Sequence, residues 1–548
     1  MKAFTEPLLS LAGFEEMTKT AEKSSGLISV TGCIDAQKSQ MIYAFGGHRK
    51  NKLIVTFGEQ KARELYDEYS FFDKEVVYYP SKDVLFYQSD IRGNLLTAER
   101  IRALKAIREQ ERVTLVTTFD ALMNTMAPIE KMWENVLTLE QGQLLDLKEI
   151  QAALIRMGYE KEYQVQTMGQ FSVRGGILDV FPLTEENPIR TELWGDEIDT
   201  IRYFDCESQK SIENIDRVSI YPAAELVLSD EEKAGGIDKL KAEAKRVSDK
   251  LRKQMKTEEA HRVTVMADEL TEEWGELSMY AGMDAFLSYF FDERVGLLDY
   301  FNPSDSLIFF DELTRCTEQG KLTETEFSES MKQRLAMGYI LPGQMNGLFT
   351  EKEIVAKLEK YSCIALAALD NKANGLHQLG SYGIHCQSVS PYNNSFELLI
   401  KDLKRYKKNG YRVILLSGSR TRAKRLSEDI TDQGITCFYT ENYDHELLEG
   451  QIMVCYGKVR RGFEYPILKF AVITESDIFG AQQKKKKRHR TYEGEKIQSF
   501  TDLSVGDYVV HENHGLGIYR GIEKLEVDKK VKDYIKIEYQ GGSNLYIL

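Results

Sequence analysis

Residues 26–46, GLISVTGCIDAQKSQMIYAFG, place a short apolar run directly before a small-residue turn and an amphipathic helical pattern. Three more apolar runs follow before residue 120, KLIVTF, EVVYYP and VTLVTTF, and helical segments separate them. Strands that alternate with helices are typical of a parallel sheet that is covered by helices. We therefore predict an α/β fold for the first part of the chain.

The rest of the chain changes its pattern several times. From about residue 160, short alternating runs with Gly and Asp turns predict a small antiparallel insert. Residues 230–300 are helical in pattern, and SLIFFDELT (306–314) is typical of a buried strand. A second α/β unit follows, with strands predicted in CIALAAL (363–369), RVILLSG, ITCFYT, QIMVCYG and KFAVITESD. Short strands with Gly turns after residue 505 predict a small β-barrel that is incomplete at Leu548.

Composition limits the class of protein. The chain has 548 residues, 42% of them hydrophobic and 29% charged, and no apolar run approaches the roughly 18 residues that would span a bilayer. Seven cysteines occur without a C-x-x-C pair, which favours a reducing compartment and argues against a zinc or disulfide framework. The formal net charge of −14 argues against nucleic-acid binding by the surface as a whole. We expect a cytoplasmic, monomeric protein. We expect it to have no membrane segment, no metal and no bound cofactor.

The turn in residues 26–46 has the position of a phosphate-binding loop but not its sequence. A working loop reads G-x-x-x-x-G-K-[ST], because its second glycine lets backbone amides close around the phosphates. If Lys38 and Ser39 supply the final pair, Gln37 stands where that glycine is needed. We therefore predict a degenerate loop without catalytic residues, in which Lys38 is a solvated helix residue.

Three segments resemble the bacterial transcription-repair coupling factor (Mfd) family. MGQFSVRGGILDVFPLTEENPIRTELWGDEIDTIRYFDCESQ (168–209) is similar to the second domain of the repair protein UvrB as it recurs in that family. GKVRRGFEYPILKFAVITESDIFG (457–480), followed by a basic run, resembles the third domain and linker. VGDYVVHENHGLGIYRGIEKLE (505–526) resembles the RNA polymerase-interacting domain shared with CarD-type regulators.

The resemblance implies a multidomain α/β chain with degenerate helicase-like parallel domains, a small antiparallel insert and a C-terminal SH3/Tudor-like β-barrel. It also implies that the DNA translocase motor of the family, with its ATP and Mg²⁺, is missing from this chain. The predicted parts are UvrB-like domain 1A (1–135), UvrB-like domain 2 (136–223), UvrB-like domain 1B (224–345), an α/β domain 3 (346–480), a basic linker (481–498) and the truncated CarD-like domain (499–548).

The same resemblance gives the loop a second register. With the UvrB loop as template, Thr31 and Gly32 match, but Asp35 replaces the lysine that reaches the phosphates. Asp311 and Glu312 occupy the place of UvrB's acidic helicase motif, and we interpret them as structural because no phosphate cradle accompanies them. Both registers predict that this chain is not an enzyme.

Family residues that face UvrA, the damage-recognising ATPase, correspond to Arg174, Arg190 and Trp194. Two arginines and an aromatic residue on paired strands suit a hot spot that binds carboxylates. The alternative is a solvated arginine pair over a core tryptophan.

In the last domain, resemblance implies that the strand at 517–527 pairs edge to edge with the β subunit of RNA polymerase. Leu525 matches the contacting position, with Ile522 and Glu526 beside it. Uninterrupted alternation predicts that Tyr519 shares one face with Glu523, Leu525 and Val527, opposite Ile518, Ile522 and Lys524.

We thus expect an adaptor that binds stalled RNA polymerase and recruits UvrA. The alternatives are a UvrB-like ATP-dependent helicase and a CarD-like transcription regulator. The basic run from Lys484 to Arg490 is either a solvated linker or a weak contact to DNA phosphates.

Overall fold

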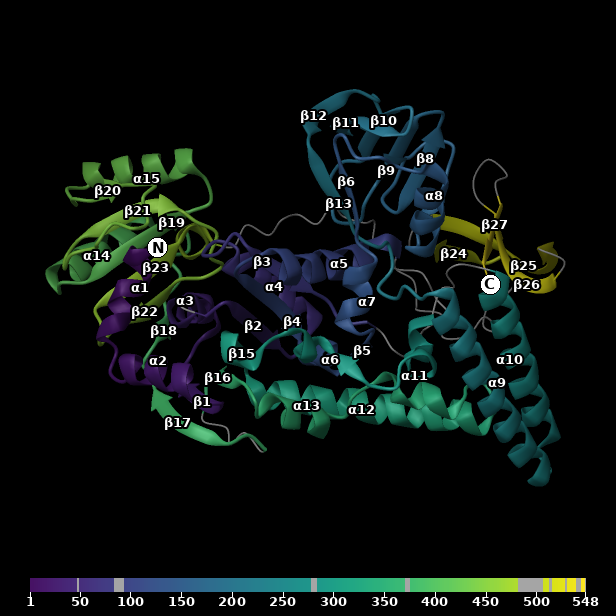
Figure 1. Cartoon of the computed structure of the whole chain (residues 1–548). Helices are drawn as coiled ribbons and strands as arrows, with labels where there is room; N and C mark the ends of the chain where they lie inside the picture. The colour runs from purple at the N-terminus through teal and green to yellow at the C-terminus, as the bar shows by residue number, and fades with distance from the viewer. Residues whose placement is uncertain are drawn as a thin grey trace. The chain divides into compact units, whose positions relative to one another are not determined.

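The computed structural model divides the chain into two compact parts, Met1–Gly480 and Ala481–Leu548. Figure 1 shows both, and each is described by itself. The structure describes residues 1–46, 49–82, 93–276, 283–369, 375–480, 506–511, 515–527, 530–538 and 544–547. No helix within these ranges is both long enough and apolar enough to cross a membrane.

A seven-stranded parallel sheet, here called the large sheet, forms the centre of the first part, with strand order β17-β1-β16-β15-β2-β4-β3. Its strands β4, β15 and β16 are buried along their whole length and β1 and β2 along most of it, as expected where helices cover both faces. The strands are β1 (Gly26–Thr31), β2 (Asn51–Thr56), β3 (Val76–Tyr79), β4 (Val113–Thr118), β15 (Ser306–Asp311), β16 (Ser362–Leu366) and β17 (Gln378–Gly383).

Two separate apolar clusters cover the faces of the large sheet. One contains Met17, Met41 and Leu65 from three helices, and the other contains Ile101 and Cys316 from helices on the opposite face. The first group is α2 (Phe14–Lys23), α3 (Asp35–Phe45) and α4 (Glu59–Tyr69); the second includes α5 (Gly93–Glu109), α6 (Phe119–Met123), α12 (Leu313–Ala336) and α13 (Glu351–Leu358). The α/β prediction for this region is confirmed.

The strand predicted at 363–369 forms, but its assignment to the second α/β unit is wrong. As β16 it lies between β1 and β15 in the large sheet. Its side chains Cys363, Ile364 and Leu366 pack in the two clusters of that sheet. An apolar run predicts a buried strand but carries no information about which sheet buries it.

An antiparallel insert confirms the second change of pattern. Its six-stranded sheet, the insert sheet, has the order β12-β11-β10-β9-β8-β7, and only β7 and β8 pair in parallel. Phe171, Leu178 and Ile201 face a core shared with α8 (Leu147–Arg156). The strands are β7 (Glu160–Lys161), β8 (Gln170–Arg174), β9 (Ile177–Val180), β10 (Ile189–Trp194), β11 (Glu197–Phe204) and β12 (Ser211–Ile215), and β6 (Leu137–Glu140) pairs separately with β13 (Arg217–Ile220).

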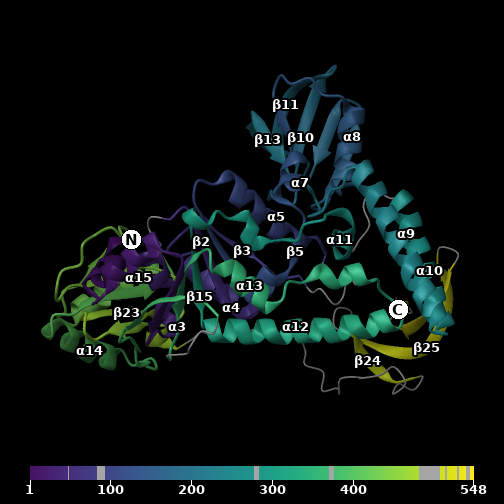
Figure 2. The same cartoon turned by 60° about the horizontal axis from the view of Figure 1, so that its bottom comes forward.

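A long helical hairpin follows the insert. Ser229 and Glu232 form a capping box at the start of α9 (Asp230–Lys253), which packs against α10 (Thr257–Glu276). Figure 2 shows the two helices side by side. Shorter elements around them are α7 (Ile129–Glu134), α11 (Leu287–Phe290), β5 (Thr125–Met126) and β14 (Val295–Gly296).

The second α/β unit has its own six-stranded sheet, in the order β18-β22-β23-β19-β21-β20. The elements are β18 (Gln387–Ser388), α14 (Phe396–Lys408), β19 (Arg412–Ser417), α15 (Arg420–Asp432), β20 (Phe438–Tyr439), β21 (Ile452–Tyr456), β22 (Phe463–Tyr465), β23 (Phe470–Thr474) and α16 (Glu475–Phe479). The N-terminal helix α1 (Lys2–Thr5) joins this unit to the large sheet, because Phe4 packs against Phe71, Phe72 and Tyr443.

The described residues of the second part form an antiparallel sheet in the order β24-β25-β26-β27. Its closure into a barrel stays a prediction. The predicted alternation along 517–527 is wrong, because the pairing of β25 with β26 shifts by one residue between Tyr519 and Ile522. The strands are β24 (Tyr508–His511), β25 (Gly515–Val527), β26 (Lys530–Glu538) and β27 (Asn544–Ile547).

Candidate functional site

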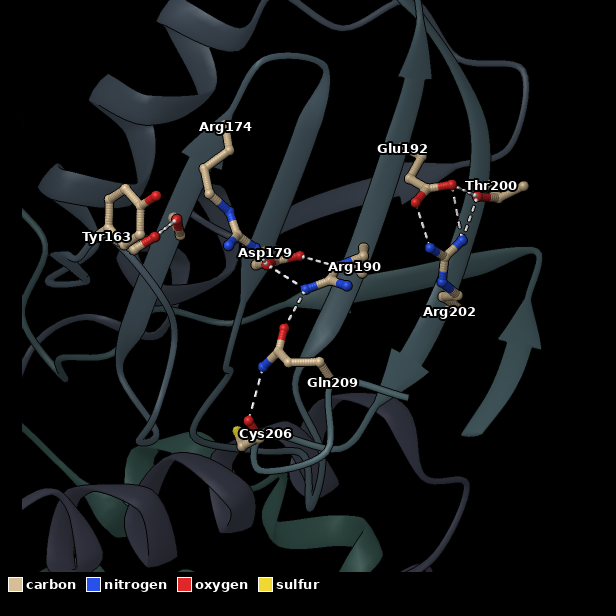
Figure 3. Close-up of polar contacts among 10 residues, drawn as sticks. Tyr163, Arg174, Asp179, Arg190, Glu192, Thr200, Arg202, Cys206 and Gln209 are labelled. Atoms are coloured by element: carbon tan, nitrogen blue, oxygen red, sulfur yellow. Dashed lines mark hydrogen bonds and ion pairs between the residues drawn. The ribbon is translucent and has the colours of Figure 1, made fainter. Parts of the chain in front are cut away.

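The outer face of the insert sheet carries a row of charged side chains. Alternation along β8, β9 and β10 turns the apolar residues to the core and leaves Arg174, Asp179, Arg190 and Glu192 on the opposite face. Figure 3 shows these residues on neighbouring strands. The structure therefore brings together the two arginines that the sequence singled out.

Asp179 is the centre of the row and is buried. The Arg174 Nη2 donates to Asp179 Oδ2 at 2.6 Å, and Arg190 donates from Nε to Oδ1 at 2.7 Å and from Nη2 to Oδ2 at 2.8 Å. A buried carboxylate needs such partners, because an unpaired charge in the interior is costly. Sequence reasoning missed Asp179. In the structure it lies opposite Arg190 in the pairing of β9 and β10, and a predicted hairpin of these two strands could have indicated this neighbour.

The two arginines differ in what they leave for a partner. Arg190 also donates to Gln209 Oε1 at 2.8 Å and lies 4.3 Å from the centroid of the Phe204 ring, so its side chain is only 13% exposed. The hydrogen bonds to Asp179 raise the pKa of Arg190. Arg174 is 34% exposed and uses one nitrogen for Asp179. Arg174 can therefore contact a partner, whereas Arg190 holds the carboxylate that positions Arg174.

A second ion pair continues the row. Arg202 lies directly opposite Arg190 in the pairing of β10 and β11, where two like charges would repel each other. Arg202 donates from Nη1 to Glu192 Oε2 at 2.9 Å, and its other nitrogen also bonds to Glu192. Arg202 is thus paired with Glu192, while Arg174 and Arg190 share Asp179.

Trp194 ends β10 with its side chain 85% exposed, just before Gly195 at a φ of 66°. The alternative of a core tryptophan is therefore wrong. Tyr163, which sequence reasoning missed, is 84% exposed in the loop after β7, and its carbonyl accepts a hydrogen bond from Ser172 of β8. Two exposed aromatic side chains on a small domain are typical of a docking surface.

The degenerate nucleotide loop is closed by the protein itself. The Gly32 and Cys33 amides donate to the carbonyls of Ala368 and Ala367 at 3.2 and 3.0 Å. A Cβ at Gly32 would lie 2.0 Å from the Ile384 carbonyl oxygen, so the chain passes directly over the turn. Two of the amides at the turn where a phosphate cradle would form already have partners.

Lys38 is not solvated, and that prediction is wrong. Its side chain is 1% exposed, and its ammonium donates to Asp311 at 2.5 Å, to Glu312 at 2.8 Å and to Asp35 at 3.2 Å. Burial alone would lower the pKa of Lys38, but the Asp311 and Glu312 carboxylates outweigh it and raise that pKa. Asp311 ends β15, 273 residues further along the chain, and Glu312 follows it. The local helical pattern around Lys38 could not reveal such distant partners.

Comparison with known proteins agrees with this arrangement. A family model described as UvrB interaction domain matches residues 137–226, and a CarD-like/TRCF RID domain model matches residues 503–547. The transcription-repair-coupling factor of Bacillus subtilis (strain 168) is 30% identical over 497 residues, which is 90% of this chain and 42% of the relative. That of Staphylococcus haemolyticus (strain JCSC1435) is 29% identical over 532 residues, 95% of this chain and 44% of the relative.

The chain is similar to the N-terminal portion of transcription-repair-coupling factors. It spans less than half the length of these relatives. The insert sheet falls inside the UvrB interaction match, and β24 to β27 fall inside the CarD-like match.

The residues predicted to contact RNA polymerase all lie in β25. Ile522, Leu525 and Glu526 pair with Ile535, Lys532 and Val531 of β26. The basic run 484–490 lies outside the described residues.

We predict that Lys38→Met destabilises the large sheet by about 3–5 kcal/mol, because Asp311 and Glu312 lose their counter-charge in the interior. Urea unfolding followed by circular dichroism, together with hydrogen exchange of peptides from α3, measures the effect. Lys241→Met on the exposed side of α9 is the control and should cost less than about 0.5 kcal/mol. Equal effects of the two variants would show that the ion cluster contributes nothing.

A second prediction compares the two carboxylates on the outer face of the insert sheet. Asp179→Asn should cost about 3 kcal/mol, since two arginines lose a buried partner, whereas Glu192→Gln at the more exposed pair should cost less than about 1 kcal/mol. Hydrogen exchange of β8 to β10 reports both. A larger effect of Glu192→Gln would contradict the central role of Asp179.

Proposed function

We propose that this chain is the adaptor portion of a transcription-repair coupling factor, which binds UvrA through the insert sheet and the β subunit of RNA polymerase through β25. One observation carries the proposal. Within the region that matches a UvrB interaction domain, Arg174 and Trp194 are exposed, while Arg190 is held by buried Asp179, which also binds Arg174.

The outer face of the insert sheet has the composition of a protein hot spot. An exposed tryptophan supplies a large apolar contact at low cost in conformational entropy, and an arginine supplies directional bonds to carboxylates. Arg174 is already ordered by Asp179, so little of its freedom is lost on binding. We infer an acidic, partly apolar surface on UvrA as the complement.

The second docking element is the edge of β25 that faces away from β26, considered among the described strands. β24 pairs with residues 515–518, and Tyr519 exchanges backbone hydrogen bonds with residues 506 and 507. Among the described strands, residues 522–527 pair only with β26. A strand from the polymerase could add to that edge, with main-chain bonds giving affinity and side chains giving register.

We further propose that the chain carries no ATP chemistry of its own. The amides of Gly32 and Cys33 and the ammonium of Lys38 are all bonded within the protein, so a nucleotide would have to break a buried ion cluster to bind. This supports an adaptor over a UvrB-like helicase, and ATP and Mg²⁺ belong to the motor that the resemblance assigns to longer family members.

Binding to purified UvrA tests the first contact. Arg174→Ala should weaken binding by about 1–3 kcal/mol and Trp194→Ala by about 2 kcal/mol or more, with hydrogen exchange of the insert sheet unchanged. Arg190→Ala should weaken binding and also lower protection of β8 to β10, because Asp179 loses its main partner.

Two variants outside the surface serve as matched controls, Arg217→Ala for the arginines and Ile467→Ala for the exposed apolar residue. Both should bind UvrA normally. Normal binding by the Arg174→Ala/Trp194→Ala double variant would remove the insert sheet's outer face from the interface.

Leu525→Arg tests the polymerase contact. If Leu525 lies at the polymerase-facing edge of β25, the variant should keep its melting temperature and lose binding to the β subunit, since a charge enters an apolar contact. Lys524→Arg in the same strand should preserve both properties. A large loss of melting temperature in Leu525→Arg would show that the residue belongs to the core of its own domain.

A further inference from the structure

A cavity of about 590 Å³ opens beside α15 in the second α/β unit. It lies where β19 and β23 end, at Ser417 and just before Glu475. β19 lies between β21 and β23 in the sheet and pairs in parallel with both. Open α/β sheets bind their ligands outside the carboxyl ends of the strands.

The floor of the cavity is already satisfied by the protein. Glu475 accepts hydrogen bonds from Ser417 Oγ at 2.8 Å and from the Gly418 amide at 2.7 Å, and it forms an ion pair with Arg422. The carboxylate thus occupies the position at the start of α15 that a phosphate would need. This arrangement disfavours a small anion as the ligand of the cavity.

The wall of the cavity is one stripe of α15. Its members recur at intervals of three and four residues, which places them on one side of the helix. Basic residues come first and acidic residues last. They are Arg422, Arg425, Leu426, Asp429, Asp432 and Gln433.

This order of charges does not stabilise α15. Cations near a helix N-terminus and anions near its C-terminus both oppose the macrodipole, and α15 has no acidic residue in its first turn and no basic one in its last. An arginine four residues before an aspartate is also the less favourable order of a pair. Within the described ranges, Arg425, Asp429 and Asp432 form no ion pair. The stripe therefore calls for an explanation outside the helix.

Apolar side chains lie at the same cavity. Phe479, at the end of α16, lines the cavity and is 48% exposed. Phe396, which begins α14, also lines it. Leu426 is buried between the charged residues of the stripe. A groove with apolar contacts between a basic end and an acidic end suits an amphipathic helix better than a small polar molecule.

We propose that this groove docks a helix of a partner protein that runs parallel to α15. Acidic residues in the first turn of that helix meet Arg425, since Arg422 is already paired with Glu475. Basic residues in its last turn meet Asp429 and Asp432, and an apolar side chain enters between Phe396 and Phe479. Such a helix has the ordinary charge order that its own dipole favours. Ten residues separate Arg422 from Asp432, which corresponds to about 15 Å and about three turns.

The groove is separate from the two proposed docking elements. Neither family match includes residues 396–479, so the inference goes beyond the adaptor function.

Two synthetic 14-residue helical peptides of equal composition, labelled with a fluorophore, test the inference on the full chain by anisotropy. The first has an acidic first turn, a basic last turn and central Leu and Phe anchors; the second has the two charged ends exchanged. We expect the first to bind about fivefold more tightly at low salt, with the preference falling as salt increases. Phe479→Ala should weaken both peptides about tenfold.

A charge exchange in the protein identifies the site. Arg425→Glu/Asp429→Lys should reverse the preference between the peptides, because both residues lie in the stripe. Lys424→Glu, on the opposite side of α15 from the stripe, is the matched control and should leave the preference unchanged.

Three results would overturn the proposal: equal binding of the two peptides, a preference that the double exchange leaves intact, or an equal effect of Lys424→Glu. Sedimentation of the chain alone supplies a further check. A dimer that dissociates in Phe479→Ala would assign the groove to a second copy of this chain and would also overturn the proposal.

Discussion

The ammonium of Lys38 joins helix α3 to the end of β15 through a buried ion cluster, although the two elements lie far apart in the sequence. In a P-loop protein the corresponding lysine would reach a nucleotide, and the acidic pair would hold its metal. Here the lysine and the acidic residues bind each other. The charge of the lysine is thus satisfied within the protein.

The second α/β unit packs directly against α3 beside this ion cluster. Gln37 and Gln40 of α3 are buried, and the hydroxyl of Tyr465 in β22 lies 3.0 Å from Gln37 Oε1. One apolar cluster accordingly runs from α2 and α3 into the second α/β unit.

Sequence patterns were informative where a structure depends on neighbouring residues. Apolar runs located β1, β2, β4 and β15, and short alternating runs located the insert sheet. They failed where the deciding partner is distant. The burial of Lys38 depends on Asp311, and the place of β16 depends on β1 and β15. The bulge in β25 was missed for a different reason, because a single extra residue leaves no trace in a hydrophobic pattern.

The candidate site shows the same limit in its side chains. Composition pointed to Arg174, Arg190 and Trp194 together, but it could not assign them different tasks. The division arises from depth: Asp179 is buried, so the arginine that fills most of its bonding capacity, Arg190, is drawn into the sheet, and Arg174 keeps nitrogens in solvent. A docking face built in this way holds its exposed cation in a fixed position before any partner arrives, which reduces the entropy that binding must overcome. The buried carboxylate of Asp179 would not contact a partner protein itself. By binding both arginines it orders the surface that such a protein would meet.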